Sequence, residues 1–278
     1  MPFARSTALV LLALLAPIGP AEAQDLPAGL ERVGAAITVV EVVDGDTVKL
    51  EDGRQVRLVG TQAPMLALGR PNFTPWPLGE ESKRALETLV QGRAVALHYG
   101  GARRDRHGRA LAHLVREDGL WIQGRMLKEG WARVYTFADN RAAVPALLAL
   151  EGEARAAKRG IWAHPFYALR TPEEAARLIG TFQIVEGPVK TVATTGGRTY
   201  LNFGADWKSD FTIALDSEAR RLFSKALGDP RRLEGQTVRV RGWLVARNGP
   251  MIELTHPEPL EVPAVLGANR PARKAAPP

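Results

Sequence analysis

The stretch from Ala36 to Gly60 constrains the fold of this chain most, because its apolar and polar residues alternate with the two-residue period of β-strands. It reads AITVVEVVDGDTVKLEDGRQVRLVG. A bend at Asp44–Asp46 and a turn at Asp52–Gly53 divide it into three segments, and Asp-Gly is a strong hairpin signal. The pattern predicts an antiparallel meander of three strands.

Helices and further strands are predicted to follow the meander. After a loop rich in Pro and Gly, residues 80–92 (EESKRALETLVQG) place their apolar side chains on one helical face and stop at a glycine. Two strand patterns, RAVALHYG and RALAHLVREDGLWI, flank a basic loop, GARRDRHGR. A short helix over 123–130 and an Ala- and Leu-rich helix over 141–158 complete this unit, and the second helix is suited to packing on a barrel.

A second strand-rich unit is predicted over 179–263, after a polar connector at 168–178. Its order of three strands, a helix and two strands matches that of a five-stranded OB-type barrel. The first unit spans 36–167 and a linker over 24–35 precedes it. The Pro- and Ala-rich basic tail at 264–278 is expected to lack packed structure.

The N-terminus has the layout of a secretory signal peptide. Arg5 precedes a short apolar run, and small residues then lead to a cleavage position after Ala23. The sequence therefore predicts a signal peptide at 1–23 and a periplasmic or extracellular protein, with an uncleaved N-terminal anchor as the alternative. No later stretch approaches the roughly twenty apolar residues of a membrane helix. The absence of cysteine excludes disulfides, thiolate metal sites and a cysteine nucleophile.

The charge of the chain favours polyanionic partners. Its formal net charge is +7, and the loop at 101–109 concentrates four arginines. Such a balance suits repeated contacts with a phosphate backbone, so nucleic acid is the first expected partner. A purely solubilising role for the basic loop is the alternative.

Four segments of the first unit resemble the staphylococcal nuclease (thermonuclease) family: VVDGDTVKL, VRLVG, DRHGRALAHL and EARAAKRGIWA. The resemblance covers about residues 36–166. It implies an α+β fold, with an OB-fold barrel and three helices. In active members of the family, a Ca²⁺ ion and two arginines bracket a phosphodiester while a glutamate activates water.

The resemblance assigns roles to residues that match the family pattern. The first metal-binding aspartate falls on Asp46, with Asp44 and Thr47 beside it. The two phosphate-binding arginines, which are the catalytic candidates, fall on Arg57 and Arg109.

Three neighbours in the basic loop are candidates for contacts with substrate. They are Arg104, Arg106 and His107.

Two positions depart from the family pattern. Gln62 stands where the second metal aspartate is expected, and Met65 where the general-base glutamate is expected. Ca²⁺ prefers several anionic oxygens, and a thioether neither accepts a proton from water nor suits a hard cation. Ca²⁺ binding is therefore expected to be weak or absent. Loss of a general base typically lowers the rate by about 10²–10⁴-fold.

Other carboxylates could replace the missing base. Glu80 and Glu81 begin the predicted helix at 80–92, and Asp105 lies close in sequence to Arg109. Acidic residues in a first helical turn are ordinary dipole chemistry, and Asp105 suits loop orientation or pairing with Arg109. We therefore expect structural roles for all three.

Aromatic residues in the second unit allow two interpretations. Tyr200, Phe203, Trp207 and Phe211 could stack bases, and Arg239 and Arg241 could contact phosphates. Aromatic residues on strands are more often core, and this interpretation is favoured for Phe203 and Phe211.

Together these features predict an exported thermonuclease-like protein that acts on or binds nucleic acid, with weak or absent phosphodiesterase activity. The alternatives are a non-catalytic nucleic-acid or polyanion-binding module and an envelope protein-interaction module. Restoring the carboxylates with Gln62→Asp and Met65→Glu is expected to produce Ca²⁺-dependent cleavage.

Overall fold

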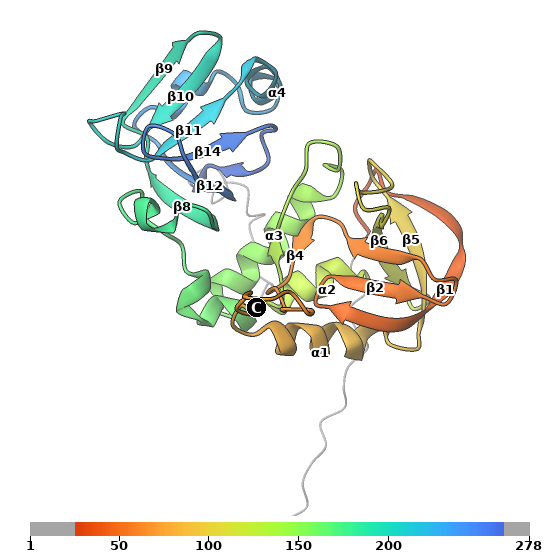
Figure 1. The fold of residues 1–278 in the computed structure, drawn as a ribbon. Helices are drawn as coiled ribbons and strands as arrows, with labels where there is room; N and C mark the ends of the chain where they lie inside the picture. The colour runs from red at the N-terminus through yellow and green to blue at the C-terminus, as the bar shows by residue number, and fades with distance from the viewer. Residues whose placement is uncertain (1–25, 264–278) are drawn as a thin grey trace, which may run out of the picture.

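The computed structural model describes residues 26–263. Its first unit is a closed barrel with the strand order β1-β2-β3-β6-β5 (Figure 1). The strands are β1 (Glu31–Asp44), β2 (Thr47–Leu50), β3 (Gln55–Leu58), β5 (Ala94–Tyr99) and β6 (Ala110–Arg116). All neighbours pair antiparallel except β3 and β6, which are parallel. The predicted meander and α+β barrel are confirmed.

The first strand begins earlier than the sequence pattern indicates. Residues 31–33 pair with 97–99 of β5, within the stretch assigned to a linker. The register shifts between Val33 and Ile37, and Gly34 has a φ of 80°. This irregularity interrupts the alternation and conceals the start of the strand.

Three helices pack on the barrel: α1 (Gly79–Val90), α2 (Ile122–Lys128) and α3 (Val144–Ala156). Along α1, Ser82, Leu86 and Val90 are buried at four-residue spacing, as expected for an amphipathic helix. The short strands β4 (Thr61–Gln62) and β7 (Arg133–Val134) pair with each other beside the barrel. No helix among residues 26–263 combines the length and apolarity required to cross a membrane.

The second unit contains two sheets and one α-helix. The larger sheet has the order β13-β14-β11-β10-β9, and the smaller sheet the order β15-β12-β8. The strands and the helix of this unit are β8 (Phe182–Pro188), β9 (Thr191–Thr195), β10 (Arg198–Asn202), β11 (Thr212–Leu215), α4 (Ser217–Leu227), β12 (Thr237–Trp243), β13 (Val245–Ala246), β14 (Pro250–Leu254) and β15 (Leu260–Glu261). The parallel pair β11–β14 resembles the pair β3–β6 of the first unit. A closed second barrel remains a prediction.

Short 3₁₀ helices accompany the connection between the units and one loop of the second. They are η1 (Gly160–Ala163), η2 (Pro165–Tyr167), η3 (Ala175–Leu178) and η4 (Pro230–Leu233). The connector at 168–178 is packed, since Ala175 is fully buried in the second core and Arg170 exchanges backbone hydrogen bonds with Ile184 and Glu186.

A buried cluster of charges joins the two units. Arg241 of β12 is 1% exposed and donates to both carboxylate oxygens of Glu151 on α3, at 2.8 and 2.9 Å, and to Glu261 at 2.6 Å. Arg239 lies at 2.5 Å from Glu186 and 3.5 Å from Glu261. The prediction that Arg239 and Arg241 contact phosphates is therefore wrong for the buried Arg241, and both side chains are engaged within the protein.

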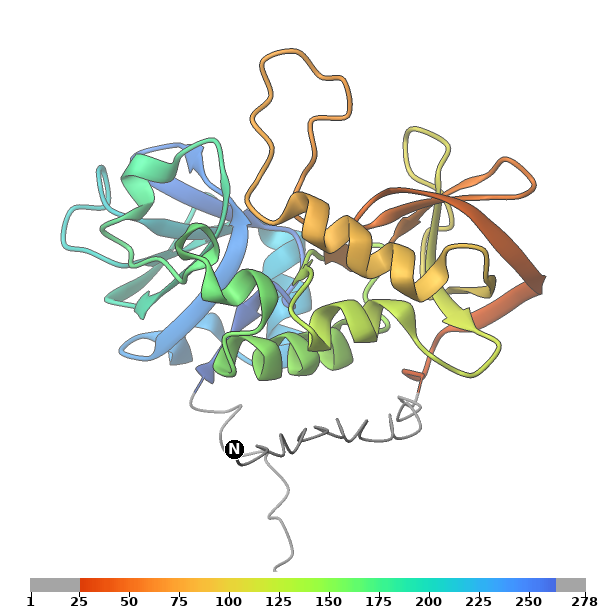
Figure 2. The same cartoon turned by 90° about the horizontal axis from the view of Figure 1, so that it is seen from below.

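The long loop between β4 and α1 protrudes from the body of the protein (Figure 2). Its base is attached by Trp76, whose N–H donates to the carbonyl of Met65 at 2.9 Å. The carbonyl of Pro77 accepts from the Tyr167 hydroxyl at 2.6 Å. The Pro-rich segment is therefore fixed at its base and extends outward at its tip.

Candidate functional site

The turn at Asp44–Asp46 lies between β1 and β2 and packs against the first turn of α1. The Asp46 N–H donates to Oδ1 of Asp44 at 3.0 Å, which closes the turn. At Gly45, an added Cβ would lie 2.1 Å from Oγ of Ser82 and 2.6 Å from Cβ of Ala63. Only glycine fits this approach, so the contact with α1 fixes the position of Asp46.

The carboxylate of Asp46 is buried and surrounded by donors. Its Oδ2 accepts from the Ala63 N–H at 2.7 Å, and its Oδ1 accepts from the Thr47 hydroxyl at 3.3 Å. Arg57 Nη1 lies 3.1 Å from Oδ1. Burial raises the pKa of Asp46 to about 7, while the charge of Arg57 opposes this rise. The predicted metal aspartate therefore forms an ion pair with the predicted phosphate-binding arginine.

Arg57 is held by further contacts with the protein backbone. It donates to the carbonyls of Leu58 at 3.0 Å and Thr61 at 2.8 Å. Its side chain is 17% exposed. The guanidinium is thus oriented by the protein and retains a limited surface for an anion.

The parallel register of β3 and β6 places Arg109 near Arg57. Arg57 pairs with Leu111, and Arg109 precedes Leu111 by two residues, so both arginines lie on the outer face of the barrel as diagonal neighbours. Arg109 Nε donates to Asp105 Oδ2 at 2.8 Å, and its side chain is 31% exposed. Asp105 also accepts the N–H groups of His107 and Arg109, each at 2.9 Å. The expected orientation of the loop by Asp105 is confirmed by these contacts.

The three substrate-contact candidates lie on this exposed loop. Arg104 Nη1 donates to the Gly108 carbonyl at 3.3 Å, and Arg106 Nε donates to His107 Nε2 at 3.1 Å. Among the described contacts Arg104 and Arg106 have no acidic partner, so their charges face solvent beside Arg109. Their contact with substrate remains a prediction.

Gln62 has a partner that the sequence did not suggest. Its Oε1 accepts from Arg133 Nε at 2.9 Å, across the paired strands β4 and β7. Arg133 is 3% exposed, and burial lowers its pKa to about 10, so it stays charged at neutral pH. The oxygen that would face a metal therefore accepts from a buried cation.

Aromatic rings enclose Arg133. Its guanidinium carbon lies 4.4 Å from the ring centroid of Phe182, 5.1 Å from that of Trp76 and 6.0 Å from that of Tyr167. Phe182 belongs to the second unit, and its carbonyl accepts from Arg133 Nη1 at 3.4 Å. Both units and the protruding loop thus hold this arginine. The sequence analysis predicted no element at Arg133, and no local pattern there identifies its partners.

The donors present fit a Ca²⁺ ion poorly. Within residues 26–263, no group of three or more His, Cys, Asp or Glu side chains is placed to hold a metal ion. Both oxygens of Asp46 already accept hydrogen bonds, and the oxygen of Gln62 is bound to a guanidinium. Ca²⁺ takes six to eight oxygen ligands, much of whose affinity comes from carboxylates.

The replacement bases considered from the sequence do not reach the Asp46 carboxylate. Glu80 and Glu81 lie exposed in the first turn of α1, and no contact with Asp46 is present among the described residues. Met65 is partly buried, and its carbonyl accepts from Trp76 at the base of the protruding loop. The site therefore holds oriented cations and one buried carboxylate without a base in contact with it.

Comparison with known proteins places the first unit in a family. Residues 55–164 match the model of the staphylococcal nuclease homologues. An uncharacterized endonuclease of Escherichia coli is 35% identical over 127 residues, which cover 45% of this chain and 74% of that protein. The Endonuclease YncB of Bacillus subtilis (strain 168) is 34% identical over 136 residues, 47% of this chain and 63% of that protein. The Thermonuclease of Staphylococcus hyicus is 28% identical over 129 residues, 45% of this chain and 75% of that protein.

This chain belongs to the staphylococcal nuclease homologue family. The matched family region, 55–164, lies within the barrel and its helices, and the second unit lies outside it.

Proposed function

We propose that this protein is exported, binds nucleic acid through the cationic face of its barrel, and hydrolyses phosphodiesters weakly or not at all. The family relationship supports action on nucleic acid. The observation that carries the finer proposal is the hydrogen bond from Arg133 to Gln62, because it places a buried cation beside the position where the family pattern has a metal carboxylate.

Binding would rest on Arg57, Arg109 and the exposed loop that carries Arg104, Arg106 and His107. Arg57 lies on β3 and Arg109 directly precedes the adjacent strand β6, which suits two contacts along one phosphate backbone. Each neutralised phosphate releases counterions, so the affinity is expected to fall steeply with salt. Asp105 keeps Arg109 oriented for this contact.

Catalysis would lack two components at this site. Methionine at position 65 cannot remove a proton from water, and Gln62 offers a neutral amide oxygen that is already engaged. The two arginines could still stabilise the charge of a phosphoryl transition state. A slow residual rate, below that of an intact nuclease, is the largest activity we expect.

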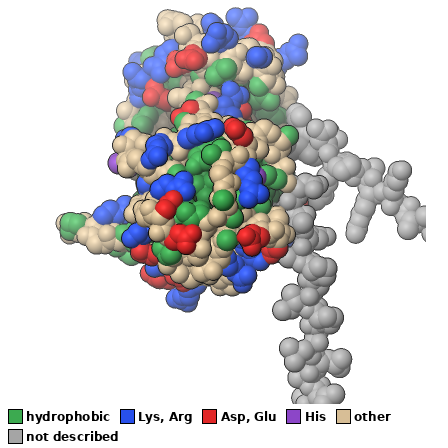
Figure 3. Space-filling view, turned by 90° about the vertical axis from the view of Figure 1, so that its right-hand side faces the viewer, with side chains coloured by type: hydrophobic (Ala, Val, Ile, Leu, Met, Phe, Trp, Pro, Cys, Tyr) green, Lys and Arg blue, Asp and Glu red, His purple; other side chains and the backbone are tan. Residues whose placement is uncertain are grey.

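One face of the molecule carries charges of both signs. On the face shown in Figure 3, Lys and Arg side chains are interspersed with Asp and Glu over both units. The surplus of +7 is therefore not gathered there into one basic patch.

Binding and cleavage of labelled single-stranded DNA and RNA test the proposal. Mature protein is measured in Ca²⁺, Mg²⁺ or EDTA, as wild type, Arg109→Ala and Asp46→Ala. We expect salt-dependent binding in all three conditions, weaker binding by Arg109→Ala, and little or no turnover. Arg232→Ala, which changes an exposed arginine of the second unit, is the matched control and should bind like wild type.

Rapid metal-dependent cleavage that Asp46→Ala abolishes would contradict the loss of catalysis. It would also direct attention to Glu80, Glu81, Asp105 and His107 as bases. Absence of binding at low salt would contradict the nucleic-acid function itself.

Export is tested separately by the mass of the protein recovered from a bacterial host. The signal peptide at 1–23 and the tail at 264–278 lie outside the described residues. We expect a mature chain that begins at Gln24 and is found in the periplasm or medium. A chain that retains residues 1–23 would support the anchor instead.

A further inference from the structure

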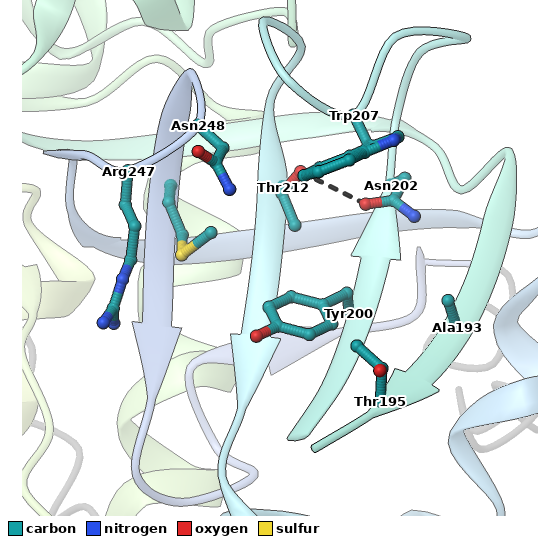
Figure 4. Close-up of a pocket in the computed structure, with 9 residues that line it drawn as sticks. Ala193, Thr195, Tyr200, Asn202, Trp207, Thr212, Arg247 and Asn248 are labelled. Carbon is teal, nitrogen blue, oxygen red and sulfur yellow. Dashed lines mark hydrogen bonds between the residues drawn. The ribbon is translucent and has the colours of Figure 1, made fainter. Parts of the chain in front are cut away.

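The larger sheet of the second unit has one face in the core and one face open to a pocket. Leu201, Ile213 and Ile252 point into the core from β10, β11 and β14. By strand alternation, their neighbours in sequence point to the opposite face. This opposite face carries Tyr200, Asn202 and Thr212 (Figure 4). Met251 lines the same pocket from β14.

The pocket on this face has a volume of about 320 Å³. Tyr200 forms part of its floor, and its cross-strand neighbours are Ala193 on β9 and Ala214 on β11. Small residues on both sides leave the face of the sheet open around the phenol ring. The volume is within the range of about 300–1,000 Å³ that is typical of ligand sites.

Trp207 borders the pocket from the loop between β10 and β11, and its side chain lies over the sheet (Figure 4). It is 56% exposed. Its loop is nevertheless well ordered by hydrogen bonds, because Asp206 accepts from the Lys208 N–H at 3.1 Å and the Ser209 hydroxyl at 2.8 Å. Asp210 Oδ2 accepts from the Asp206 N–H at 2.8 Å. The loop therefore holds a large apolar ring in water beside a cavity, an arrangement that favours a planar ligand.

Polar groups complete the pocket. Asn202 Oδ1 accepts from the Thr212 hydroxyl at 3.3 Å, which fixes an amide in the wall. Arg247 stands at the opposite rim, 56% exposed, with Nη1 at 2.7 Å from Glu253. Arg198 shares the same oxygen of Glu253 at 2.8 Å, so one carboxylate holds two cations. The two arginines and the one glutamate together leave a net positive charge at the rim.

We propose that this pocket binds a base of single-stranded nucleic acid, which stacks on Trp207 and Tyr200 while Arg247 contacts an adjoining phosphate. Stacking on aromatic rings tolerates any base, and a guanidinium beside the ring suits the backbone. The inference rests on the proposed function, since it extends the nucleic-acid surface from the barrel to the second unit. It assigns that unit a role in holding the strand.

The test compares two strands of equal length and charge, an oligothymidylate and an oligomer of abasic sites, in EDTA. Fluorescence anisotropy gives the affinity of wild type and Trp207→Ala for each strand. Base–aromatic stacking contributes about 1–3 kcal/mol, so Trp207→Ala should weaken oligothymidylate binding by about 5- to 150-fold. Binding of the abasic strand should change little, because phosphate contacts remain. Leu227→Ala, which removes another exposed apolar side chain of this unit, is the matched control and should not alter binding.

The outcomes separate this inference from the proposed function. If wild type binds oligothymidylate and Trp207→Ala binds it equally well, the pocket does not stack bases, while the barrel surface remains supported. If Trp207→Ala weakens binding of both strands equally, Trp207 acts without base recognition and the inference is overturned. If wild type binds neither strand at low salt, both proposals fail. If the pocket binds a neutral oligosaccharide and the protein does not bind oligothymidylate, the inference is overturned and the ligand of the pocket is a sugar.

Discussion

At the scale of single residues, the two departures from the family pattern could be read directly from the sequence, but their structural consequence could not. Gln62 and Met65 already indicated a weak metal site and no general base. Arg133 lies 71 residues after Gln62, and only the pairing of β4 with β7 brings them together. Local sequence patterns do not encode such a long-range pair, so the buried cation was missed.

Arg133 adds a condition to the recovery of cleavage. In the double variant Gln62→Asp/Met65→Glu, the introduced carboxylate at position 62 would pair with the guanidinium 2.9 Å from the present amide oxygen, instead of a metal ion. We expect a larger gain when Arg133→Met is added, because methionine fills the aromatic enclosure without charge. Restoring a general base typically raises the reaction rate by about 10²–10⁴-fold.

Hydrolysis of single-stranded DNA in Ca²⁺ and in EDTA measures this gain. The triple variant should exceed the double variant, and both gains should vanish with Asp46→Ala. Equal rates for the double and triple variants would show that Arg133 does not restrain the introduced carboxylate.

His113 predicts a pH dependence of stability. It is 4% exposed, and burial lowers its pKa to about 3, while its Nδ1 accepts from the Trp121 Nε1–H at 3.3 Å. The unfolded chain takes up this proton near pH 6.5, whereas the folded chain does so only near pH 3. The free energy of unfolding should therefore fall as pH drops below 6.5, by about 1.4 kcal/mol per unit for this group.

Urea unfolding at pH 7.5 and pH 5 measures the change. His113→Gln keeps an acceptor but does not titrate, so it should lose about 1–2 kcal/mol less than wild type between these values. The difference between wild type and His113→Gln removes the contribution of groups that both proteins share. One of these is Asp46, whose raised pKa increases the free energy of unfolding as pH falls. Equal losses in the two proteins would assign the effect to groups other than His113.

At the scale of elements, regular strands and helices followed their sequence patterns closely, and irregular segments did not. The buried face of α1 and the barrel meander are where alternation and helical spacing placed them. Three strands were predicted before the helix of the second unit, yet four precede α4, and the first two, β8 and β9, lie in different sheets. The chain leaves β12 for β10 after Pro188, and no local pattern marks that exchange of partners.

The packing of the Asp44–Asp46 turn against α1 predicts an intolerance at Gly45. Gly45→Ala would drive its Cβ into Ser82 and Ala63, so the turn or the helix must shift. We expect a loss of about 1–3 kcal/mol in the free energy of unfolding, as for other overpacked sites. Phosphate binding should weaken as well, because Asp46 orients Arg57.

Urea unfolding and oligonucleotide binding measure both effects. Gly152→Ala is the matched control, since Gly152 lies in α3 with nothing within 4 Å of an added Cβ. The control should gain about 0.5–1 kcal/mol from helix propensity. A Gly45→Ala variant as stable as wild type would mean that the turn moves freely away from α1.

At the scale of the whole molecule, the charged cluster around Arg241 makes the two units one packed body. The sequence predicted two units, but their relation depends on ion pairs between residues 90 positions apart. Alternation along β12 placed Arg239 and Arg241 on a polar face. That face meets α3 instead of solvent, which explains why the expectation of phosphate contacts was wrong for the buried Arg241.

Removing Arg241 should therefore be costly. Arg241→Ala leaves Glu151 and Glu261 buried beside fewer cations, and breaking such a cluster costs about 3–5 kcal/mol. Urea unfolding followed by fluorescence measures the loss, and Arg232→Ala should change stability by no more than about 0.5 kcal/mol. Replacing both glutamates by glutamine in the Arg241→Met background should recover part of the loss. Stability unchanged in Arg241→Ala would show that the units do not depend on this cluster.

The charged cluster around Arg241 also limits how the gene for this protein can be shortened or recombined. A gene shortened after residue 167 would encode the whole barrel, but it would lose Arg241 and leave the carboxylate of Glu151 with Arg155 and the Val134 N–H as its remaining partners. A recombination event that exchanged only the second unit would meet the same problem, unless the incoming segment carried its own cation for α3. The stability of the barrel thus depends on the second unit. We expect the two units to be inherited together, and to be expressed and engineered as one protein.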